Sequence, residues 1–242
     1  MSVERATLAP GHEISRLIRG GWQLAGDHGP VDRDSLNDGF LAFFDAGITA
    51  LDCADIYTGV EEMIGDFRRH LVNARGAEAL TRLKVHTKFV PDLGSLGRLT
   101  LVDVETIIDR SRARLGMDRL DLVQFHWWDY ATPGAIDAAL HLKALQQAGK
   151  IAHVAGTNFD AAHVAEFAAT GVPLASIQVQ YSLLDRRPAG AFTVTAAASD
   201  TGLICYGALA GGFLSARWLG AQDPAESLTN RSLIKYRLII DE

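Results

Sequence analysis

Short apolar runs alternate with longer segments of helical period along most of the chain. Each run predicts a β-strand, and each intervening segment, with apolar residues three and four positions apart, predicts an α-helix. Seven strands are expected, over residues 17–26, 48–54, 83–89, 120–127, 151–158, 174–181 and 202–209. The expected helices cover residues 33–46, 60–74, 100–115, 134–148, a stretch that begins after Asp160, 189–199 and 232–240. Residues 6–18, at the start, predict a small hairpin.

This alternation predicts right-handed crossovers and a parallel sheet. The element lengths favour an α/β fold, a TIM-type (β/α)8 barrel formed by residues 1–242 as a single domain. A closed barrel has eight strands, but only about seven βα units are visible before a glycine-rich turn and a last helical segment. We therefore expect an incomplete barrel, truncated at its C-terminal end relative to a longer chain, unless another segment covers its open edge.

Four polar residues stand at or just past the ends of three successive expected strands, namely Asp52, Tyr57, Lys88 and His126. The C-terminal ends of parallel strands open onto one face, so these residues are expected to converge. Singly, each is more simply explained as a solvated or structural residue, but four complementary types at corresponding positions favour a proton-transfer site. Tyrosine ionises at about pH 10, and a neighbouring ammonium lowers that value. Tyr57 beside Lys88 is therefore expected to act as a general acid.

Composition narrows the possible partners. The chain has 242 residues, of which 48% are hydrophobic and 21% charged, enough to form a substantial core. Its net charge of -6 and its scattered basic residues argue against a nucleic-acid partner. No apolar stretch reaches the roughly 18 to 20 residues of a membrane span, and the N-terminus lacks a signal-peptide pattern. These features predict a soluble protein of the cytoplasm, and they leave its oligomeric state open.

Neither cysteines nor histidines show a metal-binding spacing. Cys53 and Cys205 both lie in expected strands and are expected to be buried, reduced thiols. A metal-dependent hydrolase using His86, His126 and Asp52 is an alternative, but paired ligands of the H-x-H type are absent. We expect no metal.

Six motifs follow one another over roughly residues 15 to 215. They are DAGITALDCADIYTGVEEMIGDF, HTKF, RLGMDRLDLVQFHW, GKIAHVAGTNFD, IQVQYSLLDRRP and TGLICYGALAGGFLS. In this order they resemble the aldo-keto reductase family, and an ordered set is far more specific than a single short motif. The resemblance implies a (β/α)8 barrel and hydride transfer between a nicotinamide cofactor, usually NADPH, and a carbonyl or alcohol.

The resemblance also assigns roles to the four strand-end residues. Tyr57 would protonate the carbonyl oxygen, and Lys88 would lower the pKa of Tyr57. Asp52 would pair with Lys88 and hold it in place. His126 would orient the carbonyl through a hydrogen bond or assist proton delivery.

A cofactor site is implied as well, with the nicotinamide carboxamide bound by Thr157, Asn158 and Gln180 and its ring stacked on Tyr206. Backbone N–H groups of the following loop would cover the diphosphate. The implied cofactor residues are Gly21, Trp22, Asp52, Thr157, Asn158, Gln180, Tyr206, Gly207, Leu209 and Gly211. The candidate substrate residues are Trp22, Trp127 and Trp128, although Trp127 and Trp128 could equally be packing residues at the rim.

NADP is the expected cofactor. NAD stays open, because the family's residues for the adenosine 2'-phosphate, on the eighth strand and after it, have no counterpart in this sequence. The expected function is an NAD(P)H-dependent oxidoreductase that reduces aldehydes or ketones to alcohols. The alternative is a non-catalytic barrel relative that acts as a cofactor-binding regulatory or interaction subunit.

Overall fold

A computed structural model describes residues 3–26, 31–221, 228 and 231–241. In these residues seven parallel strands form one curled sheet in sequence order. The strands are β3 (Ile18–Gly20), β4 (Ala50–Asp52), β5 (Lys84–Phe89), β6 (Leu120–Phe125), β7 (Ile151–Thr157), β8 (Ser176–Gln180) and β9 (Gly202–Tyr206). The predicted α/β fold, an incomplete barrel of seven βα units, is confirmed.

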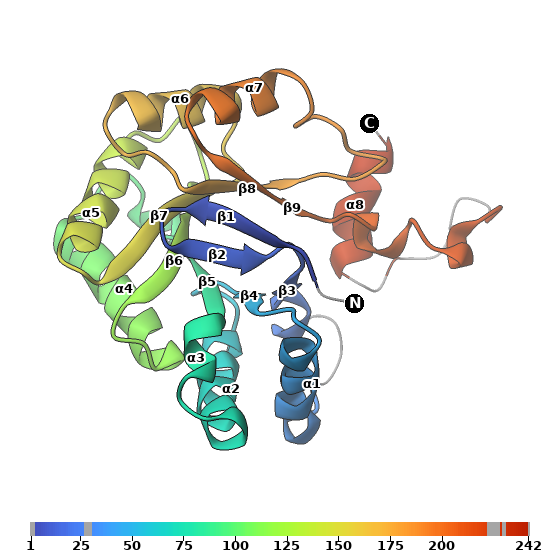
Figure 1. Cartoon of the computed structure of the whole chain (residues 1–242). Helices are drawn as coiled ribbons and strands as arrows, with labels where there is room; N and C mark the ends of the chain where they lie inside the picture. Colours follow the sequence, from blue (N-terminus) through green and yellow to red (C-terminus); the bar gives the residue numbers. More distant parts are fainter. Residues whose placement is uncertain (1–2, 27–30, 222–227, 229–230, 242) are drawn as a thin grey trace.

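Helices follow the strands and cover the outer side of the curl (Figure 1). They are α1 (Arg33–Asp45), α2 (Val60–Arg75), α3 (Ala79–Arg82), α4 (Leu101–Leu115), α5 (Ala135–Gln147), α6 (Ala161–Ala169) and α7 (Ala191–Ala198). Single 3-10 turns lie in the loops, namely η1 (Trp22–Leu24), η2 (Leu93–Ser95), η3 (Ala210–Gly212) and η4 (Ala216–Trp218). None of the helices described is both long and apolar enough to cross a membrane.

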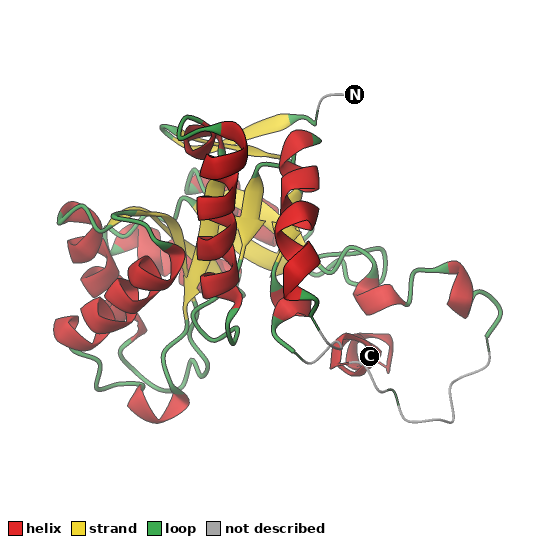
Figure 2. Ribbon diagram, turned by 90° about the horizontal axis from the view of Figure 1, so that it is seen from below, coloured by secondary structure: helices red, strands yellow, loops and turns green. Residues whose placement is uncertain are grey.

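Two elements lie at opposite ends of the sheet (Figure 2). The predicted hairpin, β1 (Arg5–Ala9) paired antiparallel with β2 (His12–Ser15), covers the end where the strands begin. There His12 of β2 lies against His86 of β5, with 2.9 Å between their Nε2 atoms. The last helix, α8 (Arg231–Asp241), lies at the end where the strands finish.

Local signals in the sequence account for the helix ends. The backbone N–H of His163 donates to the Asp160 side chain at 2.9 Å, so Asp160 caps α6 as expected. Thr100 and Asp103 form a capping box at the start of α4. Gly116 ends the same helix in the left-handed conformation, with φ of 62°.

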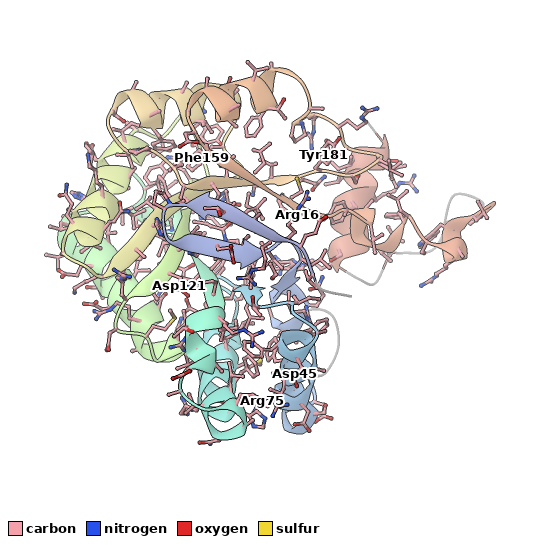
Figure 3. All side chains as sticks on the ribbon, in the orientation of Figure 1. Arg16, Asp45, Arg75, Asp121, Phe159 and Tyr181 are labelled. Carbon is pink, nitrogen blue, oxygen red and sulfur yellow. The ribbon has the colours of Figure 1, made fainter. Side chains whose placement is uncertain are left out.

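The core lies between the sheet and the helices, where Phe125 of β6 packs against Phe159, just before α6, and against Phe167 on α6. Phe125 and Phe159 have ring centroids 5.4 Å apart. Trp127 belongs to this core: it is 2% exposed and its indole N–H donates to the Thr132 carbonyl at 3.0 Å. Of the two alternatives for Trp127, the structure therefore supports packing, because its ring packs edge-on against Phe125, with 5.8 Å between the ring centroids. On the outer surface, ion pairs such as Arg75 with Asp45 (2.7 Å) join neighbouring helices (Figure 3).

The sheet has an open seam between β9 and β3. In the described part of the chain these strands do not pair with each other, and no eighth strand lies between them. Cys53 is buried, but Cys205 on β9 is exposed. The expectation that Cys205 is buried was wrong, because an edge strand has no neighbour to cover it.

Helix α8 spans this seam. Arg231 lies over the ring of Trp22, which follows β3, with 5.1 Å from its guanidinium carbon to the ring centroid. One turn later, Lys235 Nζ lies 4.6 Å from the ring centroid of Tyr206, at the end of β9. Helix α8 therefore covers the open edge at the carboxyl end of the strands.

Candidate active site

A cavity of about 1310 Å³ opens at the carboxyl ends of the strands and continues along the seam toward Leu8 and Ile14 of the hairpin. It brings together most of the predicted site. The predicted residues that line it are Trp22, Asp52, Tyr57, Lys88, His126, Trp128, Thr157, Asn158, Tyr206, Gly207, Leu209 and Gly211. Gly21, Trp127 and Gln180 are not among the lining residues.

Asp52 is the centre of a buried polar network. Its Oδ2 accepts a hydrogen bond from Lys88 Nζ at 2.6 Å, and its Oδ1 accepts from Gln124 at 2.6 Å and from Gln178 at 3.1 Å. Lys88 Nζ also donates to the Cys53 carbonyl at 2.8 Å. Four strands, β4, β5, β6 and β8, therefore hold this carboxylate and ammonium in one geometry. The additional hydrogen bonds offset part of the cost of burying this pair.

Tyr57 lies next to this pair. Lys88 Nζ is 5.4 Å from the centroid of the Tyr57 ring, and Trp22 packs edge-on against that ring at 5.2 Å. Burial raises the pKa of Tyr57 and Lys88 opposes it, so the net direction is upward. Lys88 therefore acts in the predicted direction, but desolvation outweighs it. Burial also disfavours the Lys88 cation, yet attraction to Asp52 and Tyr57 prevails and the pKa of Lys88 is raised.

His126 faces the same cavity from the end of β6. Its Nδ1 lies 3.4 Å from the Thr157 carbonyl oxygen, and Trp128 packs edge-on against its ring at 4.7 Å. Trp128 is held by a hydrogen bond from its indole N–H to the Pro91 carbonyl at 2.8 Å. Burial lowers the pKa of His126, so the imidazole is neutral at pH 7.

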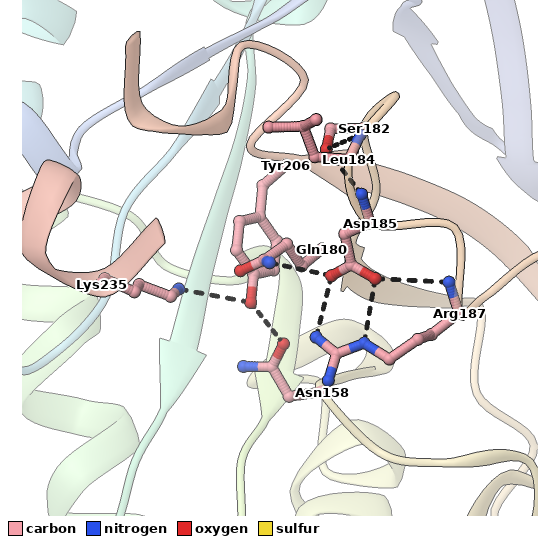
Figure 4. Close-up of polar contacts among 8 residues, drawn as sticks. All are labelled: Asn158, Gln180, Ser182, Leu184, Asp185, Arg187, Tyr206 and Lys235. Carbon is pink, nitrogen blue, oxygen red and sulfur yellow. Dashed lines mark hydrogen bonds and ion pairs between the residues drawn. The ribbon is translucent and has the colours of Figure 1, made fainter. Parts of the chain in front are cut away.

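Asn158 is held in a conformation that few residues other than glycine adopt, with φ of 64°. Its backbone N–H donates to the Gln178 carbonyl at 2.8 Å, and its own carbonyl accepts from the Tyr130 hydroxyl at 2.9 Å. Its side-chain oxygen accepts from the Tyr206 hydroxyl at 2.8 Å (Figure 4). The fold thus places the amide of Asn158 beside the Tyr206 ring.

Gln180 does not reach the cavity. Its amide donates to Asp185 Oδ2 at 2.8 Å, and Asp185 also binds the Arg187 guanidinium (Figure 4). Gln178, two residues earlier on the same strand, lines the cavity instead. The structure thus places Gln178, and not the predicted Gln180, at the cavity; both share one face of β8 and only their depth along the strand separates them.

Gly21 allows the end of β3 to pack closely against the end of β4. Its N–H donates to the Asp52 carbonyl at 2.7 Å, which ties the exit of β3 to β4. A Cβ at this position would lie 2.8 Å from Val60 Cγ1 and 2.9 Å from the Asp52 carbonyl oxygen. Only glycine therefore allows the two strand ends to approach this closely.

The sequence prediction missed Gln124 and Gln178. Gln124 stands two residues before His126, and Gln178 stands two residues before Gln180. A spacing of two places side chains on the same face of a strand. That spacing could have identified them as a second layer beneath His126 and Gln180. The cavity also includes Arg231 and Lys235 of α8, for which the sequence offered no comparable signal.

The metal alternative has no support from the geometry. Its proposed ligand His86 pairs with His12 under the hairpin, as described above. Within the residues that the structure describes, no group of three or more His, Cys, Asp or Glu side chains is arranged to hold a metal ion.

Comparison with known proteins establishes the family. The sequence matches the Aldo/keto reductase family over residues 16–240, so the chain belongs to that family. It is 28% identical over 210 residues to the aldo-keto reductase YhdN of Bacillus subtilis, which covers 86% of this chain and 62% of the relative. It is 29% identical over 204 residues to flagellar radial spoke protein 5 of Chlamydomonas reinhardtii, which covers 71% of this chain and 38% of the relative. The chain thus spans less than two thirds of the length of these curated relatives.

A solved structure shows the same fold. The aldo-keto reductase of the silkworm Bombyx mori in complex with NADP superimposes with a TM-score of 0.74 at 17% identity. The match covers 93% of this chain and 72% of the silkworm chain.

Proposed function

We propose that this protein is an NAD(P)H-dependent oxidoreductase that reduces aldehydes or ketones to alcohols, with Tyr57 as the general acid. The observation that carries the proposal is the buried Asp52–Lys88 pair directly beside Tyr57 at the wall of a large cavity. Membership of the aldo-keto reductase family supports it.

The cavity fits a nicotinamide dinucleotide in its residues. Asn158 and Gln178 offer side-chain amides for the carboxamide, and the ring of Tyr206 offers a stacking surface. The Gly207–Gly211 loop lines the same cavity next to Tyr206, and its backbone N–H groups would face the diphosphate. When bound, the nicotinamide would supply the hydride. NADP is favoured by the silkworm relative's complex, and NAD stays open.

The chain's own residues would manage the proton. Because burial raises the pKa of Tyr57, the phenol stays protonated at neutral pH and can donate to the carbonyl oxygen of the substrate. Lys88, kept cationic by Asp52, would stabilise the tyrosinate left behind. His126, neutral and beside Trp128, would orient the carbonyl. Trp22 and Trp128 would wall the substrate pocket, since both line the cavity.

Two measurements test this proposal. Quenching or enhancement of NADPH and NADH fluorescence on titration reports cofactor binding, and loss of nicotinamide absorbance with para-nitrobenzaldehyde reports reduction. Tyr57→Phe should bind the cofactor as the unmodified protein does, while kcat falls by about 100-fold or more. Tyr181→Phe removes a hydroxyl outside the cavity and should leave kcat unchanged. Equal turnover by Tyr57→Phe and the unmodified protein would contradict the assignment.

A non-catalytic role is the second candidate. It is favoured by the similarity to flagellar radial spoke protein 5, a name that describes an assembly and not a reaction. In this case the barrel would bind a nicotinamide cofactor as a regulatory or interaction subunit. Cofactor binding without turnover of any of a panel of aldehydes and ketones would favour this candidate over the first.

A further inference from the structure

The cavity is positively charged although the whole chain is acidic. Among the described residues that line it, five are basic and one, Asp52, is acidic, whereas the chain as a whole carries a net charge of -6. Lys88 is neutralised by Asp52, and Arg16 pairs with Glu4. Of the other lining cations, Arg19 and Lys235 lie within ion-pair distance of no carboxylate in the part of the chain that the structure describes, and their charge favours an anionic ligand.

Lys235 lies at the ring of Tyr206, on which the nicotinamide is expected to stack. Its Nζ lies 4.6 Å from the ring centroid of Tyr206 and 3.4 Å from the Tyr206 hydroxyl, which itself donates to Asn158 (Figure 4). In the described part of the chain, no carboxylate lies within ion-pair distance of Lys235. Desolvation lowers the pKa of Lys235, which is the sign of a cation without a compensating anion.

The backbone fixes Lys235 beside the glycine-rich loop. A side chain at Gly207 would overlap Tyr236, the residue after Lys235. A Cβ at Gly211 would lie 2.6 Å from Tyr236 Cδ2 and 2.9 Å from the Ser232 carbonyl. Helix α8 therefore packs directly on this loop, and its first turn also lines the cavity, where the helix dipole adds positive potential.

We propose that Lys235 binds the diphosphate of the nicotinamide dinucleotide. The Lys235 ammonium lies over the Tyr206 ring, beside the Gly207–Gly211 loop. A nicotinamide that stacks on this ring would displace the ammonium, which would then pair with a phosphate oxygen of the same ligand. Helix α8 thus supplies a cation for the cofactor from an element that the sequence pattern does not connect with the site. This inference rests on the proposed function.

The test compares three variants of the full chain by fluorescence titration with NADPH and with NADH. Lys235→Met keeps the length of the side chain and removes its charge, and it should raise the Kd for both cofactors by about tenfold or more. Lys235→Arg keeps the charge and should restore the Kd to within about threefold. Lys143→Met is the matched control, because it removes one charge on α5 outside the cavity, where Lys143 donates to the Gly171 carbonyl. It should leave both Kd values unchanged. Circular dichroism establishes that each variant is folded.

The outcomes separate the possible anions. An equal loss for NADPH and NADH, with a shallower dependence of Kd on salt, supports the diphosphate, which both cofactors share. A loss confined to NADPH would assign Lys235 to the 2'-phosphate and overturn the inference. If KM rises only for the substrate para-carboxybenzaldehyde and not for para-nitrobenzaldehyde, Lys235 would instead bind a substrate carboxylate, which overturns the inference too. If Lys235→Met binds both cofactors normally, this inference fails alone. If the unmodified protein binds neither, the proposed function fails with it.

Discussion

The Lys88–Asp52 pair offers the sharpest test of the site, since its effect on stability can be measured without knowing the substrate. Lys88→Met removes the ammonium and leaves the Asp52 carboxylate buried, with only the amides of Gln124 and Gln178 bonded to it. The side chains of Lys88 and Asp52 are 7% and 11% exposed, so water compensates little of the lost charge.

The size of the effect follows from that burial. Removing one partner of a buried ion pair costs about 3–5 kcal/mol, and we expect about 3 kcal/mol here because two hydrogen bonds remain on the carboxylate. For a chain of 242 residues, each kcal/mol corresponds to a change in Tm of about 2–4 °C. The expected decrease in Tm is therefore about 6–12 °C.

A double variant distinguishes lost charge compensation from lost packing. Lys88→Met combined with Asp52→Asn leaves no unpaired charge, so it should be more stable than Lys88→Met alone. Thermal and urea unfolding, followed by circular dichroism, measure both quantities. If Tm falls by less than about 2 °C in Lys88→Met, the compensated buried charge does not organise this site. The same conclusion follows if the losses of unfolding free energy in the two single variants simply add up in the double variant.

Three further predictions concern the histidine pair beneath the hairpin, the two glutamines of β8, and Gly21 at the exit of β3. Burial lowers the pKa of both His12 and His86 to about 3. As the pH falls, the unfolded chain therefore protonates these histidines before the folded chain does. The free energy of unfolding should be at its maximum above about pH 6.5 and should decrease toward about pH 3, by up to about 1.4 kcal/mol per histidine and pH unit. Urea titrations at several pH values measure this, and a flat profile in this range would contradict it. Gln178→Leu should weaken NADPH binding, whereas Gln180→Leu, at a residue outside the cavity, should not. Fluorescence titration compares the two, and the reverse order would contradict the assignment. Gly21→Ala should cost about 1–3 kcal/mol of unfolding free energy through overpacking, measured by urea denaturation. An alanine variant of unchanged stability would show that the strand exits can separate.

The sequence was sufficient to predict the strands and helices and the strand-end residues of the site. Apolar period and strand-end polarity predicted all seven strands, the hairpin and the last helix. They also placed Tyr57, Lys88 and His126 at one cavity, because parallel strands necessarily end on the same face.

What could not be predicted depends on distances through space. Gln178 and Gln180 have the same residue type on the same face of one strand, and only their depth along the strand decides which of them meets Asp52. The net direction of the Tyr57 pKa depends on how desolvation compares with Lys88, and burial is not visible in the chain. Lys235 reaches the cavity only because α8 folds back across the sheet.

The open seam links the shape of the sheet to the width of the cavity. In a closed barrel, hydrogen bonds between the last strand and the first fix the curvature. Here β3 and β9 are joined, at the carboxyl end, through the rings of Trp22 and Tyr206 and the two cations of α8 that lie over them. A ligand that contacts both edges would therefore act as a mechanical tie. Part of its binding free energy would be used to fix the curvature of the sheet. Ligand binding would therefore also make the barrel more rigid.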